Sequence, residues 1–211
     1  MDDTPQSDQS VADLNSRANL TKLLDELGEY PEHPDEIESR IKEIFEQEKA
    51  ILILDMSGFT RTTHRSGIIR FLLMIHQMQR LALPSVEEHN GLFVNAFADN
   101  LTCLFDSVHD AVIASTEVAR RLKSANVVLP ADRELYVSVG IGYGPILNVA
   151  NEAIYGSEVN LASKLGEDIA ELGEVLLTTN AHEQIKDAEI ECTEHSISVS
   201  GLEVTYYSVT T

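Results

Sequence analysis

Short apolar runs alternate along the chain with longer segments whose apolar residues recur every three or four positions. These two patterns are typical of buried strands and of amphipathic helices. The first six elements they predict are a strand at Ala50–Leu54, a helix from Gly67 to about Glu88, strands at Leu92–Phe97 and Leu101–Phe105, a helix at Val108–Lys123 and a strand at Leu135–Tyr143. Because this order is β-α-β-β-α-β, we expect an α/β sandwich of the α+β class. Its core should be ferredoxin-like, an antiparallel sheet with helices on one face.

More elements are predicted beyond this core. The pattern indicates a strand at Pro145–Val149, a helix at Val159–Leu172, a strand at Glu174–Thr178, a short helix near Ala181–Lys186 and two weaker strands around Ile197–Val199 and Glu203–Val209. We therefore expect the core sheet to be extended by added strands.

The first 48 residues are predicted to form a separate segment. Residues 1–10 are polar and should be disordered, and helical spacing predicts one helix at Val11–Leu27 and another from about Asp35 to Glu48. Residues 1–48 are thus expected to be a disordered start plus a helical arm, and residues 49–211 a folded domain. The pattern leaves open whether the helices form a free arm, a dimerisation or regulatory element, or a hairpin packed on its own domain.

The charge of the chain limits its partners. The 211 residues include 35 acidic and 15 basic ones, and the formal net charge is −20. Such a surface repels polyanions, so nucleic acid and anionic membranes are not expected as partners, although a nucleotide could bind at a local cation site. No apolar run approaches membrane-spanning length and the N-terminus lacks a basic or apolar leader, which predicts a soluble, cytoplasmic protein. Cys103 lies in an apolar run and should be a buried thiol.

An aspartate interrupts the apolar pattern at the end of the first predicted strand, in ILILDMSGFT. Asp55 ends that strand and Asp99 lies in the predicted hairpin, so a split βαβ core should bring the two carboxylates to one sheet edge. They would repel each other unless a cation neutralises them or one of them stays protonated, and Mg²⁺ prefers such hard oxygen ligands. The turn Ser57–Thr60 would aim backbone N–H groups at an anion. Spacing alone favours a plainer interpretation, a helix N-cap at Asp55 and an Asx-turn at Asp99.

Two further polar residues open a later predicted helix, in YGSEVNLASKL. Asn160 and Lys164 are four residues apart and should share one helical face. An amide and a cation on one face can hold a ribose oxygen and a phosphate. The same sequence pattern is also expected for a solvated lysine and an ordinary polar residue on a helix surface.

The segments ILILDMSGFT, GLFVNAFADNLTCLF, VSVGIGYG and IYGSEVNLASKL resemble, in order and spacing, the catalytic domain of the class III nucleotidyl (adenylate/guanylate) cyclases. The resemblance covers about Ala50 to Thr178 and implies that residues 49–211 are a catalytic domain of this kind. It implies a homodimer with two active sites at the subunit interface. It also implies that a nucleoside triphosphate, with ATP as the first candidate, is cyclised to a 3′,5′-cyclic monophosphate with release of pyrophosphate.

Site residues follow from position within these motifs. The resemblance implies that Asp55, Asp99 and the backbone carbonyl of Met56 bind two Mg²⁺ or Mn²⁺ ions per site. It implies that Asn160 orients the ribose and that Lys164, where the family usually has an arginine, stabilises the transition state, both from the opposite subunit. The residues it implies near the triphosphate are Gly58, Phe59 and Thr60.

Two base-reading positions depart from the family pattern. Asn95 stands where the family usually has lysine in the adenylyl type or glutamate in the guanylyl type. Ala153 stands where it usually has aspartate or threonine in the adenylyl type, or cysteine in the guanylyl type. The Ala153 side chain cannot hydrogen-bond a base edge, and loss of such a bond lowers base discrimination. Lys164 keeps the charge of an arginine without its bidentate fork.

Three functions stay open at this point. They are an active cyclase, a catalytically weak or inactive cyclase-homology domain that senses nucleotides or mediates dimerisation, and a ferredoxin-like interaction module with no nucleotide site. The retained aspartates together with Asn160 favour the active cyclase, because these residues carry the reaction itself.

Overall fold

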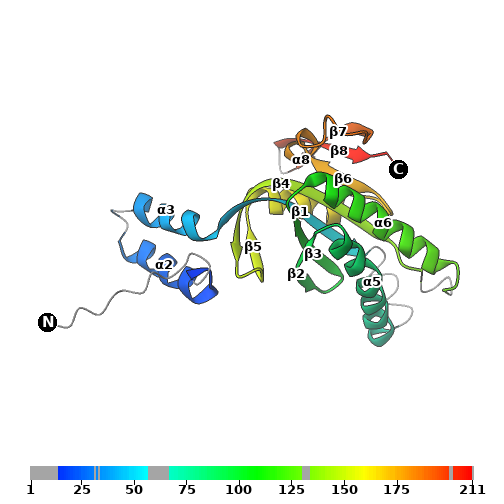
Figure 1. The fold of residues 1–211 in the computed structure, drawn as a ribbon, viewed down its shortest axis with the longest axis horizontal. Coiled ribbons are helices and arrows are strands. Elements are labelled where there is room, and N and C mark those ends of the chain that lie inside the picture. The colour runs from blue at the N-terminus through cyan, green and yellow to red at the C-terminus, as the bar shows by residue number, and fades with distance from the viewer. Residues whose placement is uncertain are drawn as a thin grey trace.

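A sheet of eight strands forms the centre of the structure, a computed structural model that describes residues 14–30, 32, 34–56, 67–129, 134–199 and 202–210. The strand order is β2-β3-β1-β4-β6-β8-β7, and β5 pairs with β4 outside this path (Figure 1). The strands are β1 (Glu46–Met56), β2 (Leu92–Phe97), β3 (Asn100–Phe105), β4 (Val137–Val149), β5 (Ala153–Tyr155), β6 (Val175–Thr178), β7 (Cys192–Val199) and β8 (Leu202–Val209). The helices are α2 (Arg17–Glu29), α3 (Pro34–Phe45), α5 (Ile68–Glu88), α6 (Val108–Asn126), α7 (Ser157–Ser163), the π-helix η2 (Lys164–Ile169) and α8 (Thr179–Glu183).

The predicted ferredoxin-like core is confirmed in strands β1 to β4 with helices α5 and α6. β1 pairs antiparallel with β3 on one side and with β4 on the other, and β2 pairs with β3. Helices α5 and α6 cover Leu52 and Leu54 on one face of the sheet, whereas α7 covers Ile51 and Ile53 on the other. β1 is therefore buried on both faces, which explains its continuous apolar run.

β4 is a single strand of 13 residues, so the prediction of a break before Pro145 is wrong. The ladder to β1 continues through Pro145, which lies opposite Glu48. Proline has no N–H to give to a strand on the other edge. That edge pairs with β6 at Val139–Ile141 and with β5 at Leu147–Val149, on either side of the proline.

Several predicted boundaries are also wrong. α3 ends at Phe45 instead of Glu48, because residues 46–48 are extended and pair with β4. The predicted helix Val159–Leu172 starts earlier and ends earlier, since α7 passes into the π-helix η2 at Lys164. The short strand β5 was not predicted at all, because three residues are too few for a period to be recognised.

The N-terminal helices α2 and α3 pack against each other and against the far end of β4 (Figure 1). α2 begins at Arg17 with Ser16 as its N-cap, later than predicted, and residues 1–13 lie outside the described part of the chain. Their apolar cluster consists of Leu23, Ile37, Ile41, Phe45 and Val149. The helices thus contact the end of β4, and their role as a dimerisation or regulatory element stays open. The domain boundary after residue 48 stays a prediction.

Two expectations on composition can also be compared with the structure. Cys103 is a free, buried thiol as predicted, and burial raises its pKa to about 12. Within the described ranges, none of the helices combines the length and the apolar character needed to cross a bilayer.

Candidate functional site

The structure brings Asp55 and Asp99 together at one end of the sheet. Asp55 is the penultimate residue of β1 and lies opposite Asn100, the first residue of β3. The next backbone N–H along β1, that of Met56, donates a hydrogen bond to the Asp99 carbonyl oxygen at 3.3 Å. Both aspartates are partly buried. The strand pairing therefore holds two carboxylates next to each other, as the sequence predicted.

These carboxylates lie in an electrostatically unfavourable place. The pKa of Asp55 is raised to about 6, first by burial and then by the negative charges of Asp99, Glu167 and Asp168. Burial also raises the pKa of Asp99. Such shifts mean that ionising the pair costs free energy, and a bound cation would offset that cost. The donor set is made of hard oxygens, which suits Mg²⁺ or Mn²⁺.

Side chains alone do not complete a metal site in the described part of the chain. There, no group of three or more His, Cys, Asp or Glu side chains is arranged to hold a metal ion. A cation at Asp55 and Asp99 would thus need further oxygens, from the main chain or from a ligand. The Met56 side chain is buried, so a contact from this residue to a cation would have to come from its backbone carbonyl. The predicted phosphate residues Gly58, Phe59 and Thr60 lie outside the described residues.

Helix α7 lies very close to β4 because glycines occupy alternate positions of that strand. A Cβ on Gly140 would lie 2.0 Å from the main-chain oxygen of Ala162. One on Gly142 would lie 2.7 Å from the main-chain oxygen of Glu158, and one on Gly144 would lie 3.1 Å from the Glu158 Cγ. The first two distances are too short for a side chain and the third is a tight contact, so the motif VSVGIGYG is the local reason that α7 can reach the sheet.

Asn160 and Lys164 lie at exposed or partly exposed positions of this helical segment. The Lys164 Nζ donates to the Asp168 Oδ2 at 2.6 Å, and the two side chains are 42% and 58% exposed. Lys164 is also the first residue of the π-helix η2, a rare conformation that is frequent at functional sites. Sequence reasoning missed Asp168 and its neighbour Glu167, although both follow Lys164 directly in KLGED.

The two positions predicted to read the base are neighbours in space. The Asn95 Nδ2 on β2 donates to the carbonyl oxygen of Glu152 at 3.1 Å, and Glu152 directly precedes Ala153 on β5. Figure 1 likewise shows β5 beside the β2–β3 hairpin. The amide of Asn95 is therefore already engaged with the main chain.

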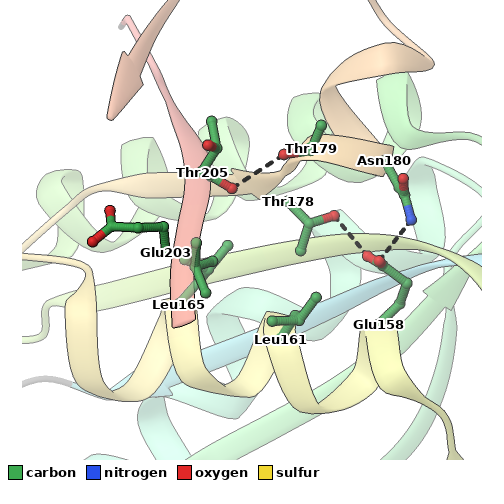
Figure 2. A pocket seen from close by; sticks show the side chains of 9 residues that line it. Glu158, Leu161, Leu165, Thr178, Thr179, Asn180, Glu203 and Thr205 are labelled. Atoms are coloured by element: carbon green, nitrogen blue, oxygen red, sulfur yellow. Dashed lines mark hydrogen bonds between the residues drawn. The ribbon is translucent and has the colours of Figure 1, made fainter. Parts of the chain in front are cut away.

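Sequence reasoning also missed Glu158, in the first turn of α7. Its carboxylate is buried and accepts hydrogen bonds from Thr178 Oγ1 and from Asn180 Nδ2, each at 2.7 Å (Figure 2). A hollow of about 300 Å³ adjoins this cluster. The residues that line it are Glu158, Leu161, Leu165, Thr178, Thr179, Asn180, Glu203, Val204 and Thr205. A glutamate in a first turn looks like an ordinary solvated residue in sequence, so no local signal marked it.

Comparison with known sequences gives two curated relatives, and no protein-family model matches the chain. "Putative adenylate cyclase 3" of Rhizobium meliloti (strain 1021) is 28% identical over 136 residues, 64% of this chain and 23% of the relative. The serine/threonine-protein kinase pkn2 of Myxococcus xanthus is 27% identical over 132 residues, 63% of this chain and 16% of the relative. The matched region thus spans less than a quarter of either relative.

Comparison with solved structures gives the same fold. The catalytic core of a rhodopsin-guanylyl cyclase with converted specificity, in complex with ATPαS, has a TM-score of 0.68 and 16% identity, over 78% of this chain and 97% of that one. An adenylate/guanylate cyclase/hydrolase from Silicibacter pomeroyi has a TM-score of 0.67 and 22% identity, over 79% and 98%. A non-canonical dimeric guanylyl cyclase domain of the RhoGC fusion protein from Blastocladiella emersonii has a TM-score of 0.66 and 15% identity, over 78% and 97%. The chain therefore has the fold of the adenylate and guanylate cyclase catalytic domains, as the motifs predicted.

Proposed function

We propose that this cyclase-like chain converts a nucleoside triphosphate, with ATP as the first candidate, to a 3′,5′-cyclic monophosphate and pyrophosphate. The observation that carries the proposal is the pair of carboxylates at the end of β1, held together by the hydrogen bond from the Met56 N–H to the Asp99 carbonyl. In this reaction the ribose 3′-oxygen forms a bond to the α-phosphorus, the bond from that phosphorus to the pyrophosphate oxygen breaks, and the hydroxyl proton leaves. A sequence relative named as a putative adenylate cyclase and the cyclase structures that share this fold support the same class of chemistry.

Asp55 and Asp99 would hold two divalent cations, Mg²⁺ or Mn²⁺, with the Met56 carbonyl as a further ligand. The raised pKa of Asp55 fits this role, because four carboxylates influence one small region and a cation would relieve their repulsion. Ions of this kind supply a lowered hydroxyl pKa and neutralisation of phosphate charge. The two carboxylates would hold and orient the ions.

Asn160 would orient the ribose through its amide, and the Lys164 ammonium would neutralise charge that builds on the phosphoryl oxygens. Lys164 must share its charge with Asp168, which lies 2.6 Å away. We therefore expect a slower reaction than an unpaired arginine would support.

A second copy of the chain would complete each site. The metal aspartates of one copy would face Asn160 and Lys164 of the other. Exposed apolar side chains on the edge strand β2 support such an association, with Phe97 83% and Phe93 40% exposed.

The test is turnover by the purified chain with Mn²⁺ and each of the four ribonucleoside triphosphates. We expect cyclic product and pyrophosphate in equal amounts, with ATP among the substrates. Absence of both products with all four nucleotides would overturn the proposal. Retention of product in Asp55→Ala would reveal a contaminating enzyme.

A second candidate function is nucleotide binding without turnover, and the pairing of Lys164 with Asp168 is the observation that favours it. Thermal unfolding with nucleotide and Mn²⁺ separates the candidates. Stabilisation by nucleotide without any product would favour the second function, whereas no shift and no product would leave only an interaction module.

A further inference from the structure

Glu158 connects three elements through one buried carboxylate. Its Oε2 accepts hydrogen bonds from Thr178 Oγ1 at 2.7 Å and from the backbone N–H of Tyr143 at 3.3 Å, and its Oε1 accepts from Asn180 Nδ2 at 2.7 Å. Glu158 belongs to α7, Tyr143 to β4, and Thr178 and Asn180 to the junction of β6 and α8 (Figure 2). The helix is thereby joined both to the strand beneath it and to the neighbouring strand.

A buried carboxylate in this position has a desolvation cost that packing alone does not explain. Glu158 is only 5% exposed, and no ion pair involves it among the described residues. An apolar side chain of similar size would avoid the desolvation cost of a charge. Three hydrogen bonds to fixed donors can form in only one register and one orientation of the helix, because they are directional. Apolar contacts do not restrict the helix in this way.

The surroundings leave little freedom for a different arrangement. A Cβ on Gly142 would lie 3.1 Å from the Glu158 Oε2, so the carboxylate lies directly on β4. The Thr178 hydroxyl also accepts a hydrogen bond from the Ala181 N–H at 3.2 Å, as the N-cap of α8. The same hydroxyl therefore fixes the start of α8 and the start of α7.

Asn160 follows Glu158 by two residues and Lys164 follows by six, within the same helical segment. We infer that Glu158 is a positioning residue that fixes the register and rotation of α7 through Thr178, Asn180 and the Tyr143 N–H, and so sets where Asn160 and Lys164 meet the substrate. This inference rests on the proposed function, because it assigns meaning to the positions of Asn160 and Lys164.

The test compares Glu158→Leu, which removes all three acceptor contacts, with Glu158→Gln, which keeps the shape. In Glu158→Gln the amide oxygen still accepts from Thr178 and Tyr143, and Asn180 can turn its own amide to accept from the new NH₂ group. We expect Glu158→Leu to lower kcat by about 10- to 100-fold with KM changed less than about threefold, since small misplacements of reacting groups have effects of this size. We expect Glu158→Gln to recover kcat to within about threefold of the unmodified chain.

Glu203→Leu is the matched control, because Glu203 is a carboxylate at an exposed position of the same hollow. It should leave kcat and KM unchanged. If Glu158→Leu fails to fold, Thr178→Val replaces it, with Thr178→Ser as the conservative partner that keeps the hydroxyl. Equal kcat in Glu158→Leu and Glu203→Leu, or no recovery in Glu158→Gln, would overturn the inference.

Backbone hydrogen exchange gives a readout that does not depend on catalysis. The amides of residues 157–163 should exchange at least about tenfold faster in Glu158→Leu, while those of residues 51–54 in β1 keep their rates. A merely structural role predicts a uniform rise in both segments, which contradicts the inference. If the unmodified chain makes no product, the proposed function fails, and the exchange pattern still decides whether Glu158 fixes α7.

Discussion

The two ends of the candidate site are built in different ways. The metal end, defined as Asp55 and Asp99, stands where a central strand meets its hairpin neighbour. Asp55 lies opposite Asn100 on one side and opposite Ser138 on the other, so backbone ladders on both edges of β1 fix its position. This rigidity is the condition under which two repelling carboxylates can be kept side by side.

The base end, defined as Asn95 and Ala153, lies on the edge strand β2 and on the three-residue strand β5. The turn before Ala153 contains two residues with positive φ, Ala150 at 54° and Asn151 at 56°. The side-chain link between the two strands is the hydrogen bond from Asn95 to the Glu152 carbonyl. Among the described strands, β2 and β5 each pair with one strand alone, so this end has fewer backbone pairings than the metal end, although hydrogen bonds to the side chains of Asn15 and Asn148 hold the turn before Ala153.

The two ends also differ in how well they match the motifs of the cyclase domains: the departures lie at Asn95 and Ala153, in the base end. Asp55 and Asp99 are the residue types that the proposed reaction needs, whereas Asn95 and Ala153 are not the types that the resemblance implies for base reading. We interpret this as a separation of reaction from base choice: substitutions at the metal end should abolish turnover, and those at the base end should redirect it.

The largest effect is expected for Asp55→Asn. The amide keeps the size of the side chain and removes the charge that would hold a cation, so turnover should fall by about 10³-fold or more. The measurement is cyclic product per active dimer with Mn²⁺, with sedimentation as the control for assembly. Turnover within tenfold of the unmodified chain would remove the metal end from the mechanism.

A smaller effect is expected from restoring the adenylyl-type residues at the base end. The double substitution Asn95→Lys with Ala153→Asp should raise the ratio of kcat/KM for ATP over GTP by about 10- to 100-fold, because paired polar groups reject a base that leaves them unsatisfied. The single variant Asn95→Lys also loses the bond to Glu152, at a cost to stability of about 1 kcal/mol. An unchanged ratio in the double variant would mean that other residues read the base.

The stability of the metal-free chain should depend on pH at the metal end. The pKa of Asp55 is raised from 3.8 to about 6, so well below pH 3.8 the folded and unfolded states are both protonated and no cost arises. As pH rises from about 4 to 6, the unfolded state ionises first, and the folded state loses about 1–2 kcal/mol once solvent screening of a half-exposed group is allowed for. Urea unfolding should show this loss in the unmodified chain and not in Asp55→Asn. Equal pH profiles for the two proteins would contradict the raised pKa.

The sequence supported the metal end better than the rest of the site, for physical reasons. A buried strand that stops at a carboxylate, and a hairpin that must pair with it, leave one arrangement for Asp55 and Asp99. The acidic residues Glu167 and Asp168 could not be placed, because the change from α-helix to π-helix at Lys164 alters which side chains face the sheet. Glu158 gave no local signal, since its partners come from strands that follow it in the chain.

The fold shows the same division between local and non-local information. Apolar periodicity predicted the order of the core elements, which depends on local patterns. The break before Pro145 was wrong because the continuity of β4 is decided by its pairing with β1. The end of α3 at Phe45 was missed for the same reason, since residues 46–48 are extended by pairing with β4 and not by their own propensity.

The smallest effect is expected for Lys164→Arg, which tests the first residue of η2. An arginine keeps the charge and adds a planar fork that can contact Asp168 and a phosphate at once, whereas the lysine ammonium shares a single point charge. We expect kcat to rise by about two- to tenfold with little change in KM, because the gain acts on charge that develops in the transition state. Lys164→Gln is the matched control and should lower kcat. If Lys164→Arg lowers kcat as much as Lys164→Gln does, the compact ammonium and its contact with Asp168 are themselves required, and the lysine is an adaptation of this chain and not a weakened arginine.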